Sequence, residues 1–221
     1  MATHYKIWIL ALTSSLIAAP ALAYDDDLGE SEGPYLFVTA GGNSGLHLCA
    51  SPNQPNPATC HSLTVGFRGG LGYQYTPMWG LEVNYGSFGR AYSDGFANFG
   101  APVGSGNYAW EMKAQGMAIQ GVATLHMGDD LAVFGKFGLA RVEYDEFLGI
   151  ASQATGNWVL INPVHAAKNT AALGAGIRYD VTPHGTIFVI YENFGSYNVY
   201  NLPVQYTVSL NMVSAGLMYR Y

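Results

Sequence analysis

Residues of the types that perform nucleophilic catalysis are few and scattered in this chain. A serine becomes a nucleophile when a histidine takes its proton and a carboxylate orients the imidazole ring. The candidates, all in segments expected to be loops, are His47, His61, His165, Ser93, Ser105 and Asp94. The chain contains no His-x-Ser pair and no nucleophile elbow. We therefore expect no catalytic residues and no enzymatic activity.

The N-terminus predicts export. Lys6 supplies a positive charge, residues 7–18 are apolar but too few to span a bilayer comfortably, and Ala21-Leu22-Ala23 is a small-x-small cleavage site. A retained membrane anchor is the alternative, which the acidic run at residues 25–27 disfavours. We expect residues 1–23 to be a signal peptide and residues 24–33 to be an acidic periplasmic segment.

Two cysteines, Cys49 and Cys60, flank the loop-like stretch "ASPNQPNPAT". In an exported chain such a pair is expected to form a disulfide, worth about 2 to 3 kcal/mol by loop closure. His47 and His61 flank the same stretch, so a Cys2His2 metal site is the alternative. The spacings match no zinc signature and thiols are seldom reduced outside the cytoplasm. We expect a disulfide, no metal and no cofactor.

Composition excludes some classes of partner and of surface. The formal net charge is −6 and no basic stripe is present, which argues against a nucleic-acid partner. Charged residues make up 11% of the chain, less than half of the roughly 25% found in soluble domains. No segment after residue 23 has 18 consecutive apolar residues, so no transmembrane helix is expected. Part of the surface must face a solvent other than water.

Alternation of apolar with small or polar residues predicts β-strands as the elements that position the polar groups. In residues 63–75, "LTVGFRGGLGYQY", the odd positions are mostly large and apolar and the even positions are polar or glycine. Similar segments, of varying regularity, bring the number of expected strands to eight: 34–42, 81–86, 112–126, 131–140, 171–181, 186–194 and 206–221.

The connections between these strands alternate between short and long. Residues 76–79, 128–130 and 182–185 are expected to be tight turns. The longer segments, expected to be loops, are residues 43–62, 89–111, 145–169 and 195–205. Short turns at one end and long loops at the other are typical of outer-membrane barrels. Residues 34–221 are thus predicted to be an all-β, eight-stranded antiparallel transmembrane up-and-down β-barrel.

The face opposite the large apolar residues is too weakly charged for a water-exposed surface, so we assign it to the lumen and the apolar face to lipid. Seven charges fall on the lumen face: Arg68, Glu82, Lys136, Arg178, Asp180, Glu192 and Arg220. We expect them to form a neutralising ion-pair network that plugs the barrel; a polar path for ions or small solutes is the alternative. An interfacial aromatic girdle is expected near the turns from Tyr35, Tyr73, Tyr75, Trp79, Tyr179, Tyr219 and Tyr221.

Four stretches carry a resemblance to a known family: "GFRGGLGYQYTPMWGLEVNYGSFG", "LAVFGKFGLARVEYD", "GAGIRYDVTPHGTIFVIYENF" and the closing "SAGLMYRY". Together they resemble the OmpA-like transmembrane barrels of Gram-negative outer membranes over residues 34–221. The resemblance implies eight strands with both chain ends in the periplasm. Residues that match the family's lumen charges are Glu82, Lys136, Arg178 and Glu192.

The last strand has two further implications. By the same resemblance, its lipid-facing half is similar to the signal read by the barrel-assembly machinery: Val213, Ala215, Leu217, Tyr219 and Tyr221. The chain departs from the family in strand seven, where Phe188 and Ile190 stand in place of lumen charges, which argues further for a plug. The polar residues near Asn211 break the alternation, so we expect either a bulge or an exit from the bilayer there.

A non-enzymatic barrel with a structural or surface-interaction (adhesin-like) role is the function we expect, because recognition normally resides in loops. Aromatic residues suited to interaction surfaces occur in the expected loops: Tyr92, Phe96, Phe99, Tyr108, Trp110, Phe147, Trp158, Tyr197 and Tyr200. The alternative is that they pack against one another or rest in lipopolysaccharide. The alternatives are a narrow pore and a lipid A-modifying enzyme. Expected partners are outer-membrane lipid and lipopolysaccharide, the assembly machinery during biogenesis, and an extracellular ligand bound by the loops. We expect the protein to be a monomer.

Overall fold

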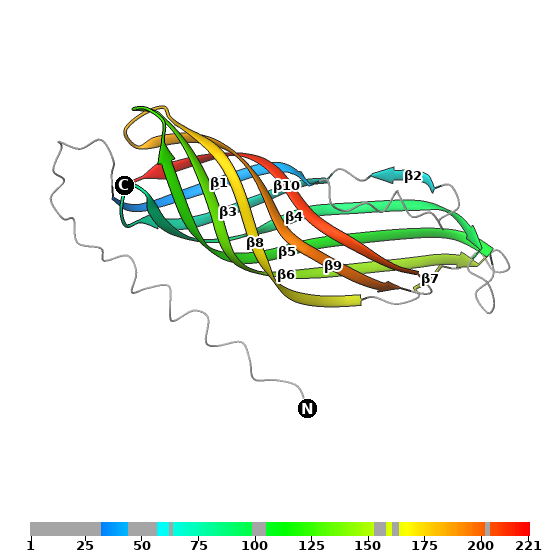
Figure 1. The fold of residues 1–221 in the computed structure, drawn as a ribbon. Helices are drawn as coiled ribbons and strands as arrows, with labels where there is room; N and C mark the ends of the chain where they lie inside the picture. Colours follow the sequence, from blue (N-terminus) through cyan, green and yellow to red (C-terminus); the bar gives the residue numbers. More distant parts are fainter. Residues whose placement is uncertain are drawn as a thin grey trace, which may run out of the picture.

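One antiparallel sheet closes on itself to form a barrel (Figure 1). The computed structural model describes residues 32–43, 57–61, 64–98, 105–152, 158–160, 164–201 and 204–221. Within these residues the principal strands are β1 (Gly33–Asn43), β3 (Thr64–Gln74), β4 (Trp79–Asn98), β5 (Ser105–His126), β6 (Leu131–Ser152), β8 (Val164–Asp180), β9 (Gly185–Asn201) and β10 (Val204–Arg220). Two short strands, β2 (Pro57–His61) and β7 (Trp158–Leu160), pair with β4 and β6.

Pairing of the first strand with the last closes the barrel. β1 and β10 pair antiparallel from Tyr35 opposite Arg220 to Asn43 opposite Met212. The predicted eight-stranded antiparallel barrel is thereby confirmed. None of the residues that the structure describes forms a helix long and apolar enough to cross a membrane. The predicted signal peptide and most of the predicted acidic segment lie outside the described residues.

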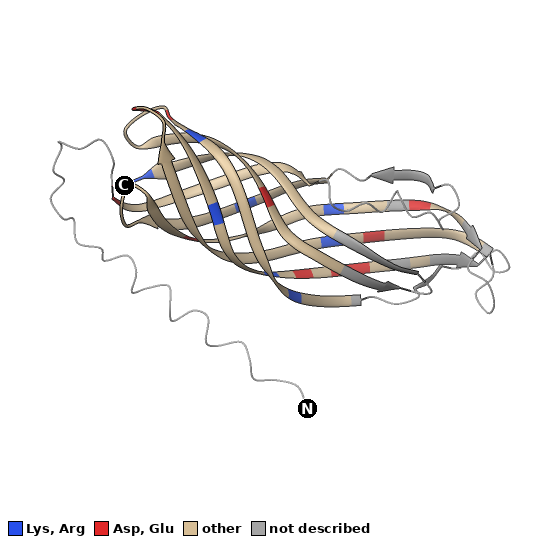
Figure 2. Cartoon of the chain, in the orientation of Figure 1, with Lys and Arg blue, Asp and Glu red and all other residues tan. Residues whose placement is uncertain are grey.

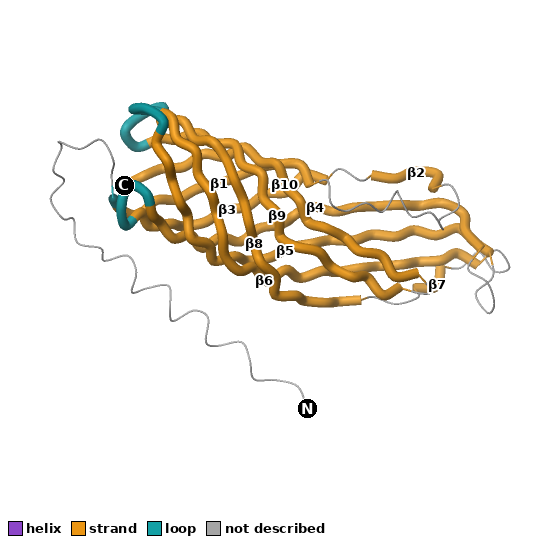
Figure 3. Tube along the Cα trace, in the orientation of Figure 1, coloured by secondary structure: helices purple, strands orange, loops and turns teal. Residues whose placement is uncertain are grey.

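The strands are longer than the sequence pattern indicated. β4, β5 and β6 reach 20, 22 and 22 residues and extend far beyond the other strands at the end opposite the C-terminus (Figure 1). The prediction that residues 89–111, 145–169 and 195–205 are loops was therefore wrong for most of their length. The short turns predicted at the other end are present, next to the C-terminus (Figure 3).

Two glycines stand where β4 and β9 were expected to end. Gly89 has φ +93° and Gly195 has φ +78°, conformations that favour glycine over other residues. At Gly89 the pairing of β4 with β5 shifts by one residue. An inserted residue of this kind is a β-bulge, which reverses the inside–outside alternation while the strand continues. The inward-facing Phe88 is accordingly followed, across the bulge, by the inward-facing Ala91.

Outside and inside faces alternate as predicted through the regular part of the barrel. The outward residues of β6 include Leu139, which is 71% exposed, and its inward neighbour Ala140 is buried. A register shift in the pairing of β9 with β10 lies at the predicted place, between Ser209 and Asn211, but the additional residue is on β9, between Asn193 and Ser196. β10 itself keeps its alternation, since Leu210 and Met212 are both buried. Six members of the expected girdle are exposed at the turn end: Tyr73, Tyr75, Trp79, Tyr179, Tyr219 and Tyr221. Tyr35 was wrongly assigned to the girdle, because its side chain points into the lumen and is 3% exposed.

Candidate functional site: the barrel lumen

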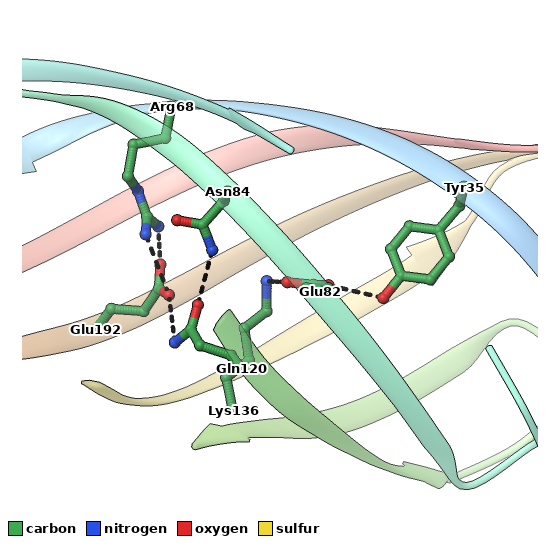
Figure 4. A network of polar contacts seen from close by, with 7 residues as sticks. All are labelled: Tyr35, Arg68, Glu82, Asn84, Gln120, Lys136 and Glu192. Atoms are coloured by element: carbon green, nitrogen blue, oxygen red, sulfur yellow. Dashed lines mark hydrogen bonds and ion pairs between the residues drawn. The ribbon is translucent and has the colours of Figure 1, made fainter. Parts of the chain in front are cut away.

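A belt of paired polar side chains crosses the interior of the barrel (Figure 4). The Arg68 guanidinium from β3 forms an ion pair with the Glu192 carboxylate from β9 on the opposite wall. Gln120 from β5 donates from Nε2 to Glu192 Oε1 at 3.4 Å, and accepts at Oε1 from Asn84 Nδ2 at 2.9 Å. All four side chains are buried, so the hydrogen bonds compensate for the loss of hydration.

The second ion pair in this belt joins Lys136 of β6 to Glu82 of β4. The Tyr35 hydroxyl donates to Glu82 Oε1 at 2.9 Å, so the carboxylate is held from two sides (Figure 4). Lys136 Nζ also lies 4.6 Å from the centre of the Phe37 ring, within the range of a cation–π contact. We call the residues Tyr35, Arg68, Glu82, Asn84, Gln120, Lys136 and Glu192 the ionic layer.

The other three predicted lumen charges lie nearer to the turn end of the barrel. Arg220 Nη2 lies 3.2 Å from Asp180 Oδ1, which also accepts from the Thr186 hydroxyl at 2.5 Å. Arg178 Nη2 donates to His126 Nε2 at 3.0 Å. The seven predicted charges thus form two groups along the barrel axis, the ionic layer and this smaller cluster.

Packed apolar side chains lie on both sides of the ionic layer. On β9, Glu192 stands between Ile190, which belongs to an apolar cluster on the turn side, and Phe194, which belongs to one on the far side. The same order recurs on β6, where Lys136 stands between Phe134 and Ala140. Every member of both clusters is at most 9% exposed, so side chains close the interior above and below the charges.

Two similar sequence motifs build the far-side closure. "SFG" at Ser87 to Gly89 and "NFG" at Asn193 to Gly195 both end at a bulge glycine. In each motif the glycine N–H donates to the first side chain, at 3.2 Å to Ser87 Oγ and 2.9 Å to Asn193 Oδ1. The two phenylalanines meet edge to face with ring centres 4.7 Å apart, and the Arg68 guanidinium lies 4.8 Å from the Phe194 ring.

Sequence reasoning missed the uncharged members of the ionic layer. Tyr35, Asn84 and Gln120 all have lumen parity, and that parity was the signal that could have found them. Gly72 makes room for Tyr35, because a Cβ built on Gly72 would lie 2.2 Å from the Tyr35 ring. Glycine on the lumen face of one strand therefore indicates a large side chain on a neighbouring strand.

The aromatic residues predicted to form an interaction surface divide into two sets. Tyr108 and Trp110 point inward and are 3% and 5% exposed, so their assignment to the surface was wrong. Trp110 Nε1 donates to the buried carboxylate of Glu146 at 2.7 Å. Tyr197 stacks on Tyr144 with ring centres 4.1 Å apart, and burial together with the negative charge of Glu146 raises the pKa of Tyr197.

Exposed aromatic side chains remain on the outer wall of the extension. Phe96 and Phe147 are 46% and 40% exposed, and Tyr92 is half-buried. Phe99 and the side chains of Trp158 and Tyr200 lie outside the described residues.

The residues considered for a catalytic triad are not brought together where the structure describes them. His165 on β8 is exposed, and its Nδ1 lies 2.6 Å from Asp145 Oδ1 on β6. Hydrogen bonding to Asp145 raises the pKa of His165. Asp94 lies on β4, from which β8 is separated by β5 and β6. His47 and the side chains of His61, Ser93 and Ser105 lie outside the described residues.

The predicted disulfide and metal site fall largely in the same undescribed segment. Cys49 lies outside the described residues, and of Cys60 only the backbone, in β2, is described. Among the described side chains no group of three or more His, Cys, Asp or Glu could hold a metal ion.

The predicted assembly signal lies on the outer wall. Val213, Leu217, Tyr219 and Tyr221 are each at least 48% exposed, and Ala215 is exposed beside them. Tyr219 packs edge to face on Tyr221 with ring centres 5.2 Å apart.

A closed β-barrel with an apolar outer wall and ion pairs inside defines a small membrane-spanning barrel. Residues 33–221 match the OmpA-like transmembrane domain family, and the chain belongs to that family. It is an outer-membrane β-barrel protein of Gram-negative bacteria and is not an enzyme. The localisation and the non-enzymatic character predicted from the sequence are confirmed.

The chain is similar to several solved outer-membrane barrels, and one of them, with a TM-score above 0.5, supports the same fold. The outer membrane protein OprG from Pseudomonas aeruginosa is 12% identical, with a TM-score of 0.54 over 88% of this chain and 99% of that one. The N-terminal barrel of Pseudomonas aeruginosa OprF is 13% identical, with a TM-score of 0.49 over 86% and 100%. Ail, the attachment invasion locus protein of Yersinia pestis, is 16% identical, with a TM-score of 0.43 over 86% and 100%. No curated protein matches the sequence.

Proposed function

We propose that this protein is a closed structural barrel that presents interaction surfaces on strands extending beyond the outer membrane. The observation that carries the proposal is the contrast between a packed lumen and three strands of 20 to 22 residues. About ten residues of tilted strand suffice to cross a bilayer. The remaining length of β4, β5 and β6 is available for contacts outside the membrane.

The packed lumen favours a structural role over a pore. Solute passage would require the ionic layer to open and both apolar clusters to move apart. We expect the purified protein to leave planar bilayers non-conducting. A double variant, Phe88→Ala with Phe194→Ala, is expected to remain non-conducting as well, because the ionic layer and the turn-side cluster still close the lumen. Steady conductance of the unaltered protein, sensitive to Lys136→Gln, would establish the pore instead.

The surface role is tested by shortening the β4–β5 hairpin without disturbing the barrel. Phe96 pairs directly with Asn107, so residues 96–107 can be replaced by Asn-Gly, a dipeptide suited to a two-residue hairpin turn. We expect cells that carry the shortened protein to lose adhesion or envelope integrity at unchanged surface level. A full-length Phe96→Ser variant separates the contribution of the aromatic side chain from that of the strands. Unchanged adhesion and unchanged detergent resistance would reject the surface role.

We also propose that the exposed row ending at Tyr221 directs assembly, as the family resemblance implies. Tyr221 is 65% exposed at the end of β10, where a barrel-assembly factor could reach it. Deletion of Tyr221 is expected to lower the amount of inserted protein, measured by heat-modified gel mobility, and normal insertion would contradict the proposal.

The Cys49–Cys60 disulfide is retained as a proposal, tested by mass spectrometry before and after reduction.

A further inference from the structure

The far part of the β9–β10 hairpin leaves the barrel wall on both of its sides. In the described part of the chain, the ladder between β9 and β8 ends at Asn193, and the ladder between β10 and β1 ends at Met212. Beyond these residues, segments 196–201 and 204–209 pair only with each other. The bulge at Gly195, with φ +78°, lies at the base. A segment with so few backbone bonds to its surroundings opens more readily than the rest of a sheet. We call the two paired segments the flap.

Side-chain contacts link the flap to β8 and to β6. Lys168 Nζ of β8 donates to the Ser196 carbonyl at 2.6 Å. Tyr197 stacks on Tyr144 of β6, with ring centres 4.1 Å apart and ring planes 15° apart. β8 lies between β6 and β9, and the residue that it places opposite Tyr144 is Ala166. Because alanine is small, the Tyr197 ring can reach across β8 to the inner wall of β6.

The inner wall that Tyr197 reaches combines aromatic rings with one carboxylate. We call these residues, each at most 5% exposed, the inner aromatic cluster: Tyr108, Trp110, Tyr144 and Glu146. Carboxylates follow one another along this part of β6 (Figure 2). Glu143 and Asp145 lie on the outer face, whereas Glu146 points inward and accepts from Trp110 Nε1 at 2.7 Å. A negative charge is thereby held among aromatic side chains.

We propose that the inner aromatic cluster, uncovered when the flap moves aside, binds the ammonium group of an organic cation. Aromatic ring faces attract cations, and the charge of a buried carboxylate is little screened by water. Burial and the negative charge of Glu146 raise the pKa of Tyr197, because the two side chains lie close together. The Tyr197 ring therefore occupies the place, beside Glu146 and over Tyr144, that the ammonium would take.

The surroundings of the cluster favour an organic cation over a metal ion, and binding over passage. Calcium takes about six or more oxygen ligands, whereas the cluster offers one carboxylate among rings. Towards the membrane the cluster adjoins Phe88 and Phe194, whose rings meet at 4.7 Å and close the interior. A ligand that enters from the far end stops there. Such binding adds a function to the structural role and requires no pore.

Isothermal titration calorimetry of the whole protein in dodecyl maltoside micelles tests the charge preference. The probes are choline, a quaternary ammonium, and dimethylbutanol, its uncharged carbon isostere. We expect choline to bind about tenfold more tightly than the isostere, and Glu146→Gln to abolish the difference. Glu143→Gln is the matched control, because it removes the same charge from the outer face of β6 and should leave the preference intact. Equal affinity of the unaltered protein for both probes would overturn the proposal, as would equal losses in the two variants.

The role of the flap is tested at Tyr197 with the same titration. Tyr197→Ala is expected to bind choline about fivefold more tightly, because no aromatic stack must be broken before the ligand enters. Tyr197→Phe keeps the stack and should bind as the unaltered protein does. Heat-modified gel mobility checks that each variant is folded. Unchanged or weaker binding by Tyr197→Ala would overturn the flap, and binding of choline by neither Tyr197→Ala nor the unaltered protein would overturn the site.

Discussion

Strand β6 has opposite polarity in its two halves. Near the turns its outward residues are apolar, such as Leu139, and its inward residues include Lys136 of the ionic layer. Further along, the outward residues are Arg141, Glu143 and Asp145, whereas the inward Val142 and Tyr144 are buried. The first half has the polarity of a membrane barrel and the second that of a water-soluble one.

The reversal shows that the surrounding solvent, and not the strand, selects which face is apolar. In hydrocarbon an outward charge is costly and charges are tolerated only where they pair inside. Outside the membrane, outward charges are hydrated and the interior is held by apolar packing, as in soluble barrels. The same pairing register runs through both halves, from Leu131 opposite Tyr179 to Glu146 opposite Val164. Four experiments can break or sharpen this contrast.

The largest effect is expected when one charge of the ionic layer loses its partner. Glu192→Leu leaves Arg68 buried and without its carboxylate, which should lower the free energy of unfolding by about 3–5 kcal/mol. Urea unfolding in lipid vesicles, followed by tryptophan fluorescence, measures the change. The double variant Arg68→Met with Glu192→Leu removes both charges and should recover most of the loss. A Glu192→Leu protein as stable as the unaltered one would show that the interior is not closed to water.

A charge placed outward on β6 should act differently in the two halves. Leu139→Arg puts a cation on the apolar outer wall and is expected to cost about 2–4 kcal/mol of unfolding free energy. Phe147→Arg, eight residues further along the same face, should change stability by about 0.5 kcal/mol or less. The same urea titration compares the two variants. Equal costs at both positions would place the membrane boundary elsewhere.

The bulge at Gly195 lies where β9 leaves its pairing with β8, which within the described residues ends at Leu173 opposite Asn193. Gly195→Ala would have to adopt φ +78° and would place its Cβ 2.0 Å from Thr170 Oγ1. We expect a loss of about 1–3 kcal/mol in unfolding free energy. Gly135→Ala, at an open position with no atom nearer than 3.8 Å, is the control and should be nearly neutral. Similar stability of the two variants would contradict a strained bulge.

The smallest effect concerns the exposed pair of His165 and Asp145. Hydrogen bonding to Asp145 raises the pKa of His165 above its ordinary value of 6.5, so the protonated form is favoured in the folded state. The pair therefore stabilises the extension fully below pH 6.5, and its contribution is lost as the pH rises through the raised pKa. Asp145→Asn should lower the pKa of His165, measured by NMR titration. An unchanged pKa would show that the two side chains do not interact in solution.

The period of two was enough to predict the membrane-spanning half. Large apolar residues at odd positions from Leu63 to Tyr75 placed Arg68 inside, and the polar break near Asn211 marked the register shift between β9 and β10. On β4 and β9 the continuation was missed because Gly89 and Gly195 interrupt the alternation and resemble strand ends. Tyr35 was wrongly assigned to the girdle because an aromatic residue near a turn can face either lipid or the lumen. Only the strand pairing shows that Gly72 lies opposite Tyr35 and leaves room for its ring inside the barrel.

By itself the sequence determined the eight strands, their two faces and the side on which each lumen charge lies, because strand parity depends only on position along the chain. Only the tertiary structure decided that Arg68 pairs with Glu192 and Lys136 with Glu82, since closure of the barrel brings together residues up to 124 positions apart. It also decided that Arg90 pairs with Lys113 and Arg141 with Met117, because register and bulges set these pairings, and neither is a local property of the sequence.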